Sequence, residues 1–189
     1  MPKLGMEPVR RAALVRATIA EIGAAGSLDV TVSKIAKRAG MSSALAHHYF
    51  GAKDQIFLAA MRQILRDYSA EVRAELAKAH TPAARARAII RANFAQSCFD
   101  PATVSAWMTF YAQAQTNPEA LHLLRVYQRR LRSNLIHALR PIADDPSGAA
   151  DTLAAVIDGL YIRAALTSPD ADPQKTALQT LTILTKGAA

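Results

Sequence analysis

The chain has 189 residues, of which 51% are hydrophobic and 20% charged, so it can bury a sizeable core and is not a disordered tail. Its formal net charge of +8 favours an acidic partner such as nucleic acid. The single cysteine, Cys98, excludes an intramolecular disulfide framework, and no paired-ligand zinc spacing is present.

The N-terminal third carries the basic bias. Residues 1–66 hold ten Lys or Arg against four acids, whereas the remainder holds thirteen against eleven. The start, MPKLGMEPVRR, lacks the apolar segment of a signal peptide, and no stretch approaches a membrane span of about eighteen apolar residues, so we expect a cytoplasmic protein. An amphipathic helix is predicted over about residues 8–25, and Arg10 and Arg11 at its start are expected to meet a DNA backbone.

The next segment, residues 31–50, predicts a helix-turn-helix. Its first helix, about residues 32–39, gathers an apolar face at the i, i+3, i+4, i+7 spacing. Thr31 is a suitable N-cap, Gly40 supplies the left-handed residue that ends the helix, and Ser42 caps a second helix over about residues 43–49. A helix of two turns is not stable alone, so Leu45 and Tyr49 are expected to brace it.

The outer face of the second helix suits the major groove of duplex DNA, because serine and histidine hydrogen-bond to base edges and alanine meets a thymine methyl group. A lysine at the start of the following helix is placed to hold a phosphate. The predicted DNA-binding residues are Thr31, Lys34, Lys37, Ser42, Ser43, Ala44, His47, His48, Tyr49 and Lys53.

Proline placement organises the rest of the chain, because most prolines follow a residue suited to capping a helix, and no region shows sustained β alternation. We therefore predict an all-α fold with a three-helix head in residues 1–53 and a helical ligand-binding and dimerisation body in residues 54–189. The nine predicted helices cover about residues 8–25, 32–39, 43–49, 54–78, 82–98, 101–115, 118–140, 147–167 and 173–186.

The body contains a candidate cation site. One helix carries Trp107 and Tyr111 on an apolar face, and another places Asp158 among apolar residues, with Tyr161 one turn along and Gly159 opening space for close helix approach. A buried carboxylate is costly unless it is paired or meets a cation. Aromatic rings and one acid suit a quaternary ammonium, which is held by cation-π and charge attraction.

Plainer interpretations stay open at these positions. Trp107 and Tyr111 have the spacing of an ordinary core stripe, and an arginine is an alternative partner for Asp158. Cys98 has the character of a small buried hydrophobe, and two adjacent histidines face apart on a helix, which disfavours a metal site at His47 and His48. The arginine run at residues 129–132 is typical of a solvated face.

The same residues carry a resemblance to the TetR repressor family. Residues 31–53 are similar to its DNA-binding segment, and further stretches resemble its BetI type, the choline-responsive repressors of glycine betaine synthesis genes. The family matches are Ile35, Ala36, Ala39, Gly40, Ser42, Tyr49, Phe50 and Lys53. The BetI-type matches are MPKLGM with Arg10 and Arg11, HYF at 48–50, Ala106 and Trp107 with Phe110 and Tyr111, RRLRSNL at 129–135 and IDGLYIRAAL at 157–166.

That resemblance implies a homodimer, joined through its last two helices, that binds a palindromic operator and responds to choline. The implied effector site comprises Trp107, Phe110, Tyr111, Asp158 and Tyr161, with no cofactor, no metal and no membrane partner. The alternative is a TetR-type sensor of another cationic or hydrophobic molecule that controls efflux or catabolic genes. An enzyme is disfavoured because the chain has no nucleophile elbow, glycine-rich phosphate loop or HExxH motif. A helical adaptor that uses only its dimer surface is a further rival.

Overall fold

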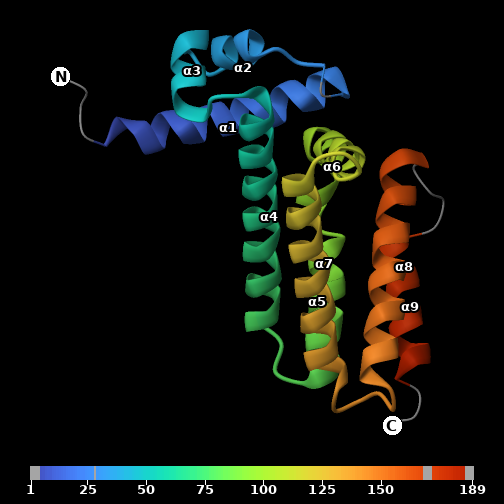
Figure 1. Ribbon diagram of the computed structural model, residues 1–189. Helices are drawn as coiled ribbons and strands as arrows, with labels where there is room; N and C mark the ends of the chain where they lie inside the picture. Colours follow the sequence, from blue (N-terminus) through green and yellow to red (C-terminus); the bar gives the residue numbers. More distant parts are fainter. Residues whose placement is uncertain (1–4, 28, 168–171, 186–189) are drawn as a thin grey trace. The chain divides into compact units, whose positions relative to one another are not determined.

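The structure is a computed structural model that describes residues 5–27, 29–167 and 172–185 (Figure 1). These residues form nine α-helices and one 3-10 helix, without a strand, and no helix among them is long and apolar enough to cross a membrane. The predicted all-α class is confirmed. The elements are α1 (Met6–Ala25), α2 (Val32–Arg38), α3 (Ser43–Phe50), α4 (Lys53–Ala77), α5 (Pro82–Asn93), η1 (Gln96–Phe99), α6 (Pro101–Gln113), α7 (Pro118–Leu139), α8 (Pro146–Thr167) and α9 (Pro173–Leu184).

The last five α-helices share one kind of start. Each begins at a proline, whose missing N–H is not needed in the first helical turn. The residue before each proline accepts hydrogen bonds from backbone N–H groups of that turn through its side-chain oxygen. These capping residues are Thr81, Asp100, Asn117, Asp145 and Asp172. The helix starts that the proline pattern predicted are therefore confirmed to within one residue.

The predicted fifth helix, residues 82–98, is wrong in its last five residues. The α-helix ends at Asn93, and η1 follows after a short break. At the break the Phe94 N–H bonds to the Arg91 carbonyl at 3.1 Å, and the Asn93 side-chain amide donates to the Ile89 carbonyl at 2.8 Å. No glycine or proline marks the change, so the local sequence gave no signal for it.

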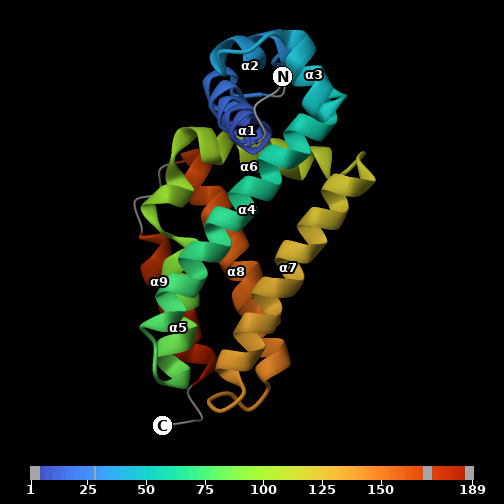
Figure 2. The same cartoon turned by 90° about the vertical axis from the view of Figure 1, so that its left-hand side faces the viewer.

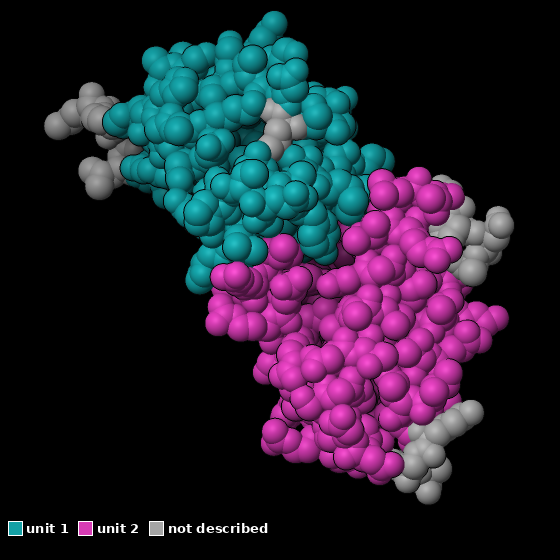
Figure 3. Space-filling model, turned by 45° about the vertical axis from the view of Figure 1, so that its right-hand side comes forward, with its two compact units in different colours: residues 1–66, 100–123 teal, residues 67–99, 124–189 magenta. Residues whose placement is uncertain are grey.

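The chain divides into two compact units (Figure 3). Unit 1 comprises residues 1–66 and 100–123, so it contains α1, α2, α3, the first half of α4, α6 and the start of α7. Figure 1 shows α2 and α3 lying over α1, and α1 also packs closely against α6. The closest approach is at Gly23, where a Cβ atom would lie 2.4 Å from the Cα and Cβ of Ala102.

Unit 2 comprises residues 67–99 and 124–189. In it α9 packs against both α5 and α8, and η1, residues 67–77 of α4 and residues 124–139 of α7 complete the unit (Figure 2). Its core is built from fully buried aliphatic side chains, including Ile90, Leu131, Leu135 and Leu153. Gly159 on α8 does not serve a close helix approach within the described chain, because a Cβ atom there would meet nothing within 4 Å. That part of the prediction is wrong.

Candidate nucleic-acid interface and effector site

The turn between α2 and α3 is fixed by two caps and one glycine. The Thr31 hydroxyl accepts from the Lys34 N–H at 3.2 Å, and the Ser42 hydroxyl accepts from the Leu45 N–H at 3.2 Å. Gly40 has a φ of 69°, the left-handed conformation that glycine adopts without strain. The predicted caps and the helix-ending glycine are confirmed, so the sequence sets the angle between the two helices locally.

The inner side of α3 is small and the outer side is polar. Ala46 is the residue of α3 that is fully buried, while Leu45 and Tyr49, the predicted braces, are partly buried. Of the predicted DNA-binding residues, only Ser43 and Tyr49 are partly buried. The exposed ones are Thr31, Lys34, Lys37, Ser42, Ala44, His47, His48 and Lys53. These eight residues are free of the core of unit 1 and are accessible to a ligand.

The start of α1 contacts the end of α3, which the sequence did not reveal. The Arg11 guanidinium carbon lies 5.6 Å from the ring centroid of Tyr49 and 5.1 Å from that of Phe50, within cation-π range. Its Nε also donates to Glu7 at 2.8 Å, and Arg10 donates to the Tyr49 hydroxyl at 3.5 Å. Arg11 therefore stacks on the aromatic end of the helix-turn-helix. The expectation that Arg10 and Arg11 meet a DNA backbone stays a prediction.

His47 closes the C-terminus of α3. Its Nδ1 lies 2.7 Å from the carbonyl oxygen of Gly51, while the Gly51 N–H donates to the His47 carbonyl at 2.7 Å. Gly51 has a φ of 69°, so this cap requires a residue that tolerates the left-handed region. The His47 side chain, which is predicted to contact DNA bases, is therefore held in one position by its contact with Gly51.

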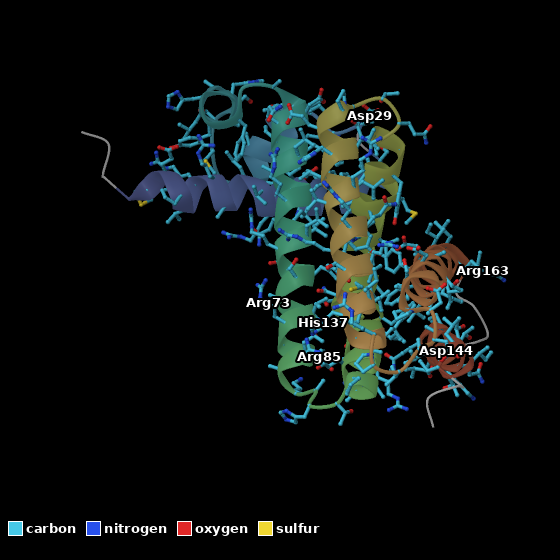
Figure 4. All side chains as sticks on the ribbon, turned by 60° about the horizontal axis from the view of Figure 1, so that its bottom comes forward. Asp29, Arg73, Arg85, His137, Asp144 and Arg163 are labelled. Atoms are coloured by element: carbon cyan, nitrogen blue, oxygen red, sulfur yellow. The ribbon has the colours of Figure 1, made fainter. Side chains whose placement is uncertain are left out.

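In unit 2, the candidate counter-charge Asp158 has a neutral partner. Its Oδ1 accepts a hydrogen bond from the Tyr127 hydroxyl at 3.0 Å. Burial raises the pKa of Asp158 above its usual range, and the bond from Tyr127 opposes that rise only in part. No lysine or arginine of the described chain forms an ion pair with Asp158. Arg163, on the same helix, is exposed and lies at the outer edge of α8 (Figure 4).

Tyr127 links Asp158 to two further helices. Its ring meets that of Tyr68 on α4 edge-on, with 5.6 Å between the centroids. The Tyr68 hydroxyl donates to Oδ1 of Asn93 on α5 at 3.0 Å, and Asn93 is 6% exposed. Burial raises the pKa of Tyr68, so its phenol stays a hydrogen-bond donor. Asp158, Tyr127, Tyr68 and Asn93 form a polar and aromatic chain across α8, α7, α4 and α5, which we call the carboxylate chain.

A second aromatic group lies at η1. The Tyr161 hydroxyl donates to the Cys98 carbonyl at 2.9 Å, and the ring of Tyr161 lies 5.3 Å from that of Phe99, centroid to centroid. Phe99 in turn stacks on Phe94 at 6.5 Å. Cys98 is partly buried, and burial raises the pKa of its thiol. Tyr161 therefore holds η1 against α8. Because α5 ends at Asn93, the chain can turn into η1 and place Phe99 beside the ring of Tyr161.

The five predicted effector residues divide between the two units. Trp107, Phe110 and Tyr111 belong to unit 1, where the ring centroid of Trp107 lies 5.7 Å from that of Phe110 and 5.9 Å from that of Tyr111. Asp158 and Tyr161 belong to unit 2. Sequence reasoning missed the other members of the carboxylate chain, because Tyr68, Asn93 and Tyr127 come from three different helices. Within the described ranges, no cluster of His, Cys, Asp or Glu is arranged to hold a metal ion.

Two family models match the chain. Residues 14–60 match "Bacterial regulatory proteins, tetR family", and residues 82–186 match "BetI-type transcriptional repressor, C-terminal". The first match covers the helix-turn-helix, and the second covers α5 to α9. The two matches therefore join a DNA-binding head to a BetI-type body in a single chain.

Curated relatives agree with the two family models, and a solved structure shares the fold. The chain is 51% identical to the HTH-type transcriptional regulator BetI of Brucella anthropi over 168 residues, 88% of this chain and 87% of that protein. It is also 51% identical to BetI of Rhizobium meliloti over 170 residues, 89% of this chain and 84% of that protein. A transcriptional regulator from Saccharomonospora viridis, solved in complex with choline, is 21% identical with a TM-score of 0.80, covering 92% of this chain and 93% of that one. The chain belongs to the TetR family of DNA-binding transcriptional regulators and is a regulator of the BetI type.

Proposed function

We propose that this regulator represses the genes of glycine betaine synthesis and that choline is its effector. The BetI relatives at about half identity support the gene set, since that type is the choline-responsive group to which the sequence motifs are similar. The choline in the fold neighbour supports the effector class. The likeness to the relatives and to the fold neighbour does not rest on individual side-chain contacts, so the contacts of Asp158 support the proposal independently.

The observation that carries the effector proposal is the environment of Asp158. Its carboxylate is partly buried, its hydrogen-bond partner is the neutral phenol of Tyr127, and the ring of Tyr127 packs edge-on against that of Tyr68. A quaternary ammonium has no N–H to donate, so it binds by charge attraction and by contact with aromatic faces. Choline therefore needs only the charge of Asp158 and leaves the Tyr127 bond intact. We propose Trp107, Phe110, Tyr111 and Tyr161 as further effector-binding residues.

On the DNA side, we propose that α3 lies in the major groove. Ser43, Ala44, His47 and His48 then face base edges, while Lys34, Lys37 and Lys53 meet phosphates. Thr31, Ser42 and Tyr49 contribute at the ends of the two helices. Because phosphate contacts release counterions, affinity for any duplex is expected to fall steeply with salt.

We propose that two copies pair through α8 and α9. Leu166 on α8 and Ile183 on α9 are 63% and 67% exposed, which is the exposure expected of apolar residues that a second copy covers. A two-fold axis would set two heads on a palindromic operator with half-sites about one helical turn of DNA, or a multiple of it, apart. A hundredfold loss of operator affinity requires that choline prefer the non-binding state by only about 2.7 kcal/mol.

Titration calorimetry of the full chain with choline, glycine betaine and a hydrophobic dye tests the effector. We expect choline to bind and Asp158→Asn to weaken it at least tenfold. The matched control is Asp144→Asn, an exposed aspartate (Figure 4), which should leave choline affinity unchanged. Heat from the dye alone would replace the choline proposal with the sensor of hydrophobic molecules. Equal choline affinity in the Asp158→Asn protein would show that this carboxylate does not face the ligand.

A further inference from the structure

The cap at the end of α3 fixes which nitrogen of His47 carries a proton. A backbone carbonyl oxygen only accepts hydrogen bonds, so the short contact of 2.7 Å between Nδ1 and the Gly51 oxygen requires Nδ1–H as the donor. The reciprocal bond from the Gly51 N–H to the His47 carbonyl holds the two residues together. His47 is four residues before Gly51, so the ring closes over the last turn of its own helix.

The other ring nitrogen is then an acceptor. A neutral imidazole has one donor and one acceptor nitrogen, and the proton on Nδ1 leaves a lone pair on Nε2. Nε2 lies across the ring from Nδ1 and therefore points away from the Gly51 carbonyl. Since the residue is exposed, that lone pair is available to a ligand. A histidine without this cap would switch between tautomers and would accept or donate as its partner required.

We infer that His47 is a specificity-determining residue that contacts the amino group of an adenine or a cytosine in the major groove. Each base pair carries one such amino group on one of its two bases, so His47 selects which base of the pair faces it and disfavours guanine or thymine at the contacted position. Only adenine N6 and cytosine N4 offer such donors there, whereas guanine O6 and N7 and thymine O4 are acceptors that would repel the Nε2 lone pair. This inference rests on the proposed placement of α3 in the groove. It assigns the direction of the hydrogen bond: the base donates from its amino group and Nε2 of His47 accepts, so guanine is not a partner.

The cap itself is tested without DNA. The ring nitrogens of the full-length ¹⁵N-labelled protein are measured by NMR at about pH 8.5, where imidazole side chains are neutral. We expect a protonated Nδ1 and an unprotonated Nε2 at His47. A proton on Nε2, or rapid exchange between the two tautomers, would overturn the inference. The measurement uses the wild-type chain, so it does not depend on any variant folding.

The base contact is tested on DNA. A randomised duplex library first yields the preferred site of the wild-type protein, and the His47→Phe and His47→Ala proteins identify the position that loses its preference. That base pair is then replaced by an analogue that lacks only the adenine 6-amino or the cytosine 4-amino group. We expect the wild type to lose about fivefold in affinity beyond the loss shown by His47→Ala on the same duplex. The wild type and His47→Ala are each measured on the natural duplex and on the analogue duplex. Any loss that comes from weaker base pairing of the analogue is then the same for both proteins and drops out of the comparison.

The control is His48→Ala, which removes the neighbouring histidine, whose ring lies 5.5 Å from that of Tyr49, centroid to centroid. It should keep the wild-type penalty for the missing amino group. An equal penalty for wild type and His47→Ala would overturn the inference, and so would a penalty that appears only when a 7-deaza purine removes the N7 acceptor. If the wild type selects no common site from the library, the placement of α3 in the groove fails first, and the two failures are thereby distinguished.

Discussion

Gly23→Ala is the substitution for which the structure gives the sharpest expected effect on unit 1. A Cβ atom at residue 23 would lie 2.4 Å from the Cα and the Cβ of Ala102 on α6. Carbon atoms in contact prefer about 3.5–4.0 Å, so α1 and α6 must separate by about 1 Å to admit the methyl group. Overpacking costs about 1–3 kcal/mol, and we expect the upper half of that range because the clash is with the backbone Cα and the Cβ of Ala102, which cannot rotate away. The better helix propensity of alanine offsets up to about 1 kcal/mol. We expect a net loss of about 1–2 kcal/mol in the free energy of unfolding.

The assay is thermal unfolding of the full chain followed by circular dichroism. For a protein of this length the loss corresponds to a decrease of roughly 3–6 °C in Tm. Gly159→Ala is the matched control, because it also lies inside a helix but a Cβ there meets nothing within 4 Å. It should raise stability by up to about 1 kcal/mol. A Gly23→Ala protein as stable as the control would refute the close approach of α1 and α6.

Four further substitutions and a change of pH test the two sites. Thr31→Ala and Ser42→Ala each remove an N-cap, so each should lower the free energy of unfolding by about 1 kcal/mol and weaken operator binding in a gel-shift assay; unaltered stability would contradict the capping geometry. Arg11→Gln removes both the stacked guanidinium and its charge, so operator affinity should fall while its salt slope stays the same; a slope lower by about one would instead indicate a phosphate contact. Tyr127→Phe leaves Asp158 without its hydrogen bond, so the pKa of that carboxyl should rise further when followed by NMR, and an unchanged titration would argue against the bond. Choline binding needs the ionised Asp158, so in calorimetry the Kd should be constant above the raised pKa of that group and increase about tenfold per pH unit below it; a Kd independent of pH would contradict the role of the charge.

The head was predictable from sequence because its signals are local. A cap acts within three residues, as Thr31 and Ser42 do, and Gly40 sets its own backbone conformation. The proline-led starts of α5 to α9 are equally local. These features depend on interactions between residues close together in the chain, so they can be predicted from the sequence.

The features that were missed depend on contacts between distant segments. Gly23 resembles any helical glycine until Ala102 is brought against it from 79 positions along the chain. α5 ends at Asn93 where η1 packs against Tyr161. No glycine or proline in the sequence marks that end. Asp158 was found because a single acid in an apolar stretch is conspicuous. Its partner Tyr127 was not predicted, because the sequence does not show which residue of α7 lies opposite Asp158 on α8.

The assignment of Trp107, Phe110 and Tyr111 to the effector site stays a prediction. Their aromatic cluster is well packed within unit 1, with Phe110 fully buried, which is also what an ordinary core stripe would show. Asp158 has stronger geometric support, since a partly buried carboxylate without a cationic partner in the described chain is costly to retain. The effector site is therefore best approached experimentally from Asp158.

The proposed function depends on choline weakening the binding of this regulator to an operator. The decisive measurement is a footprint of the protein on the DNA upstream of its own gene, with and without choline. We predict two protected half-sites about one helical turn, or a multiple of it, apart, related by two-fold symmetry, whose protection weakens when choline is added. Two results would contradict this proposal: loss of all protection when non-specific competitor DNA is present, or protection that choline leaves unchanged while glycine betaine or a dye removes it.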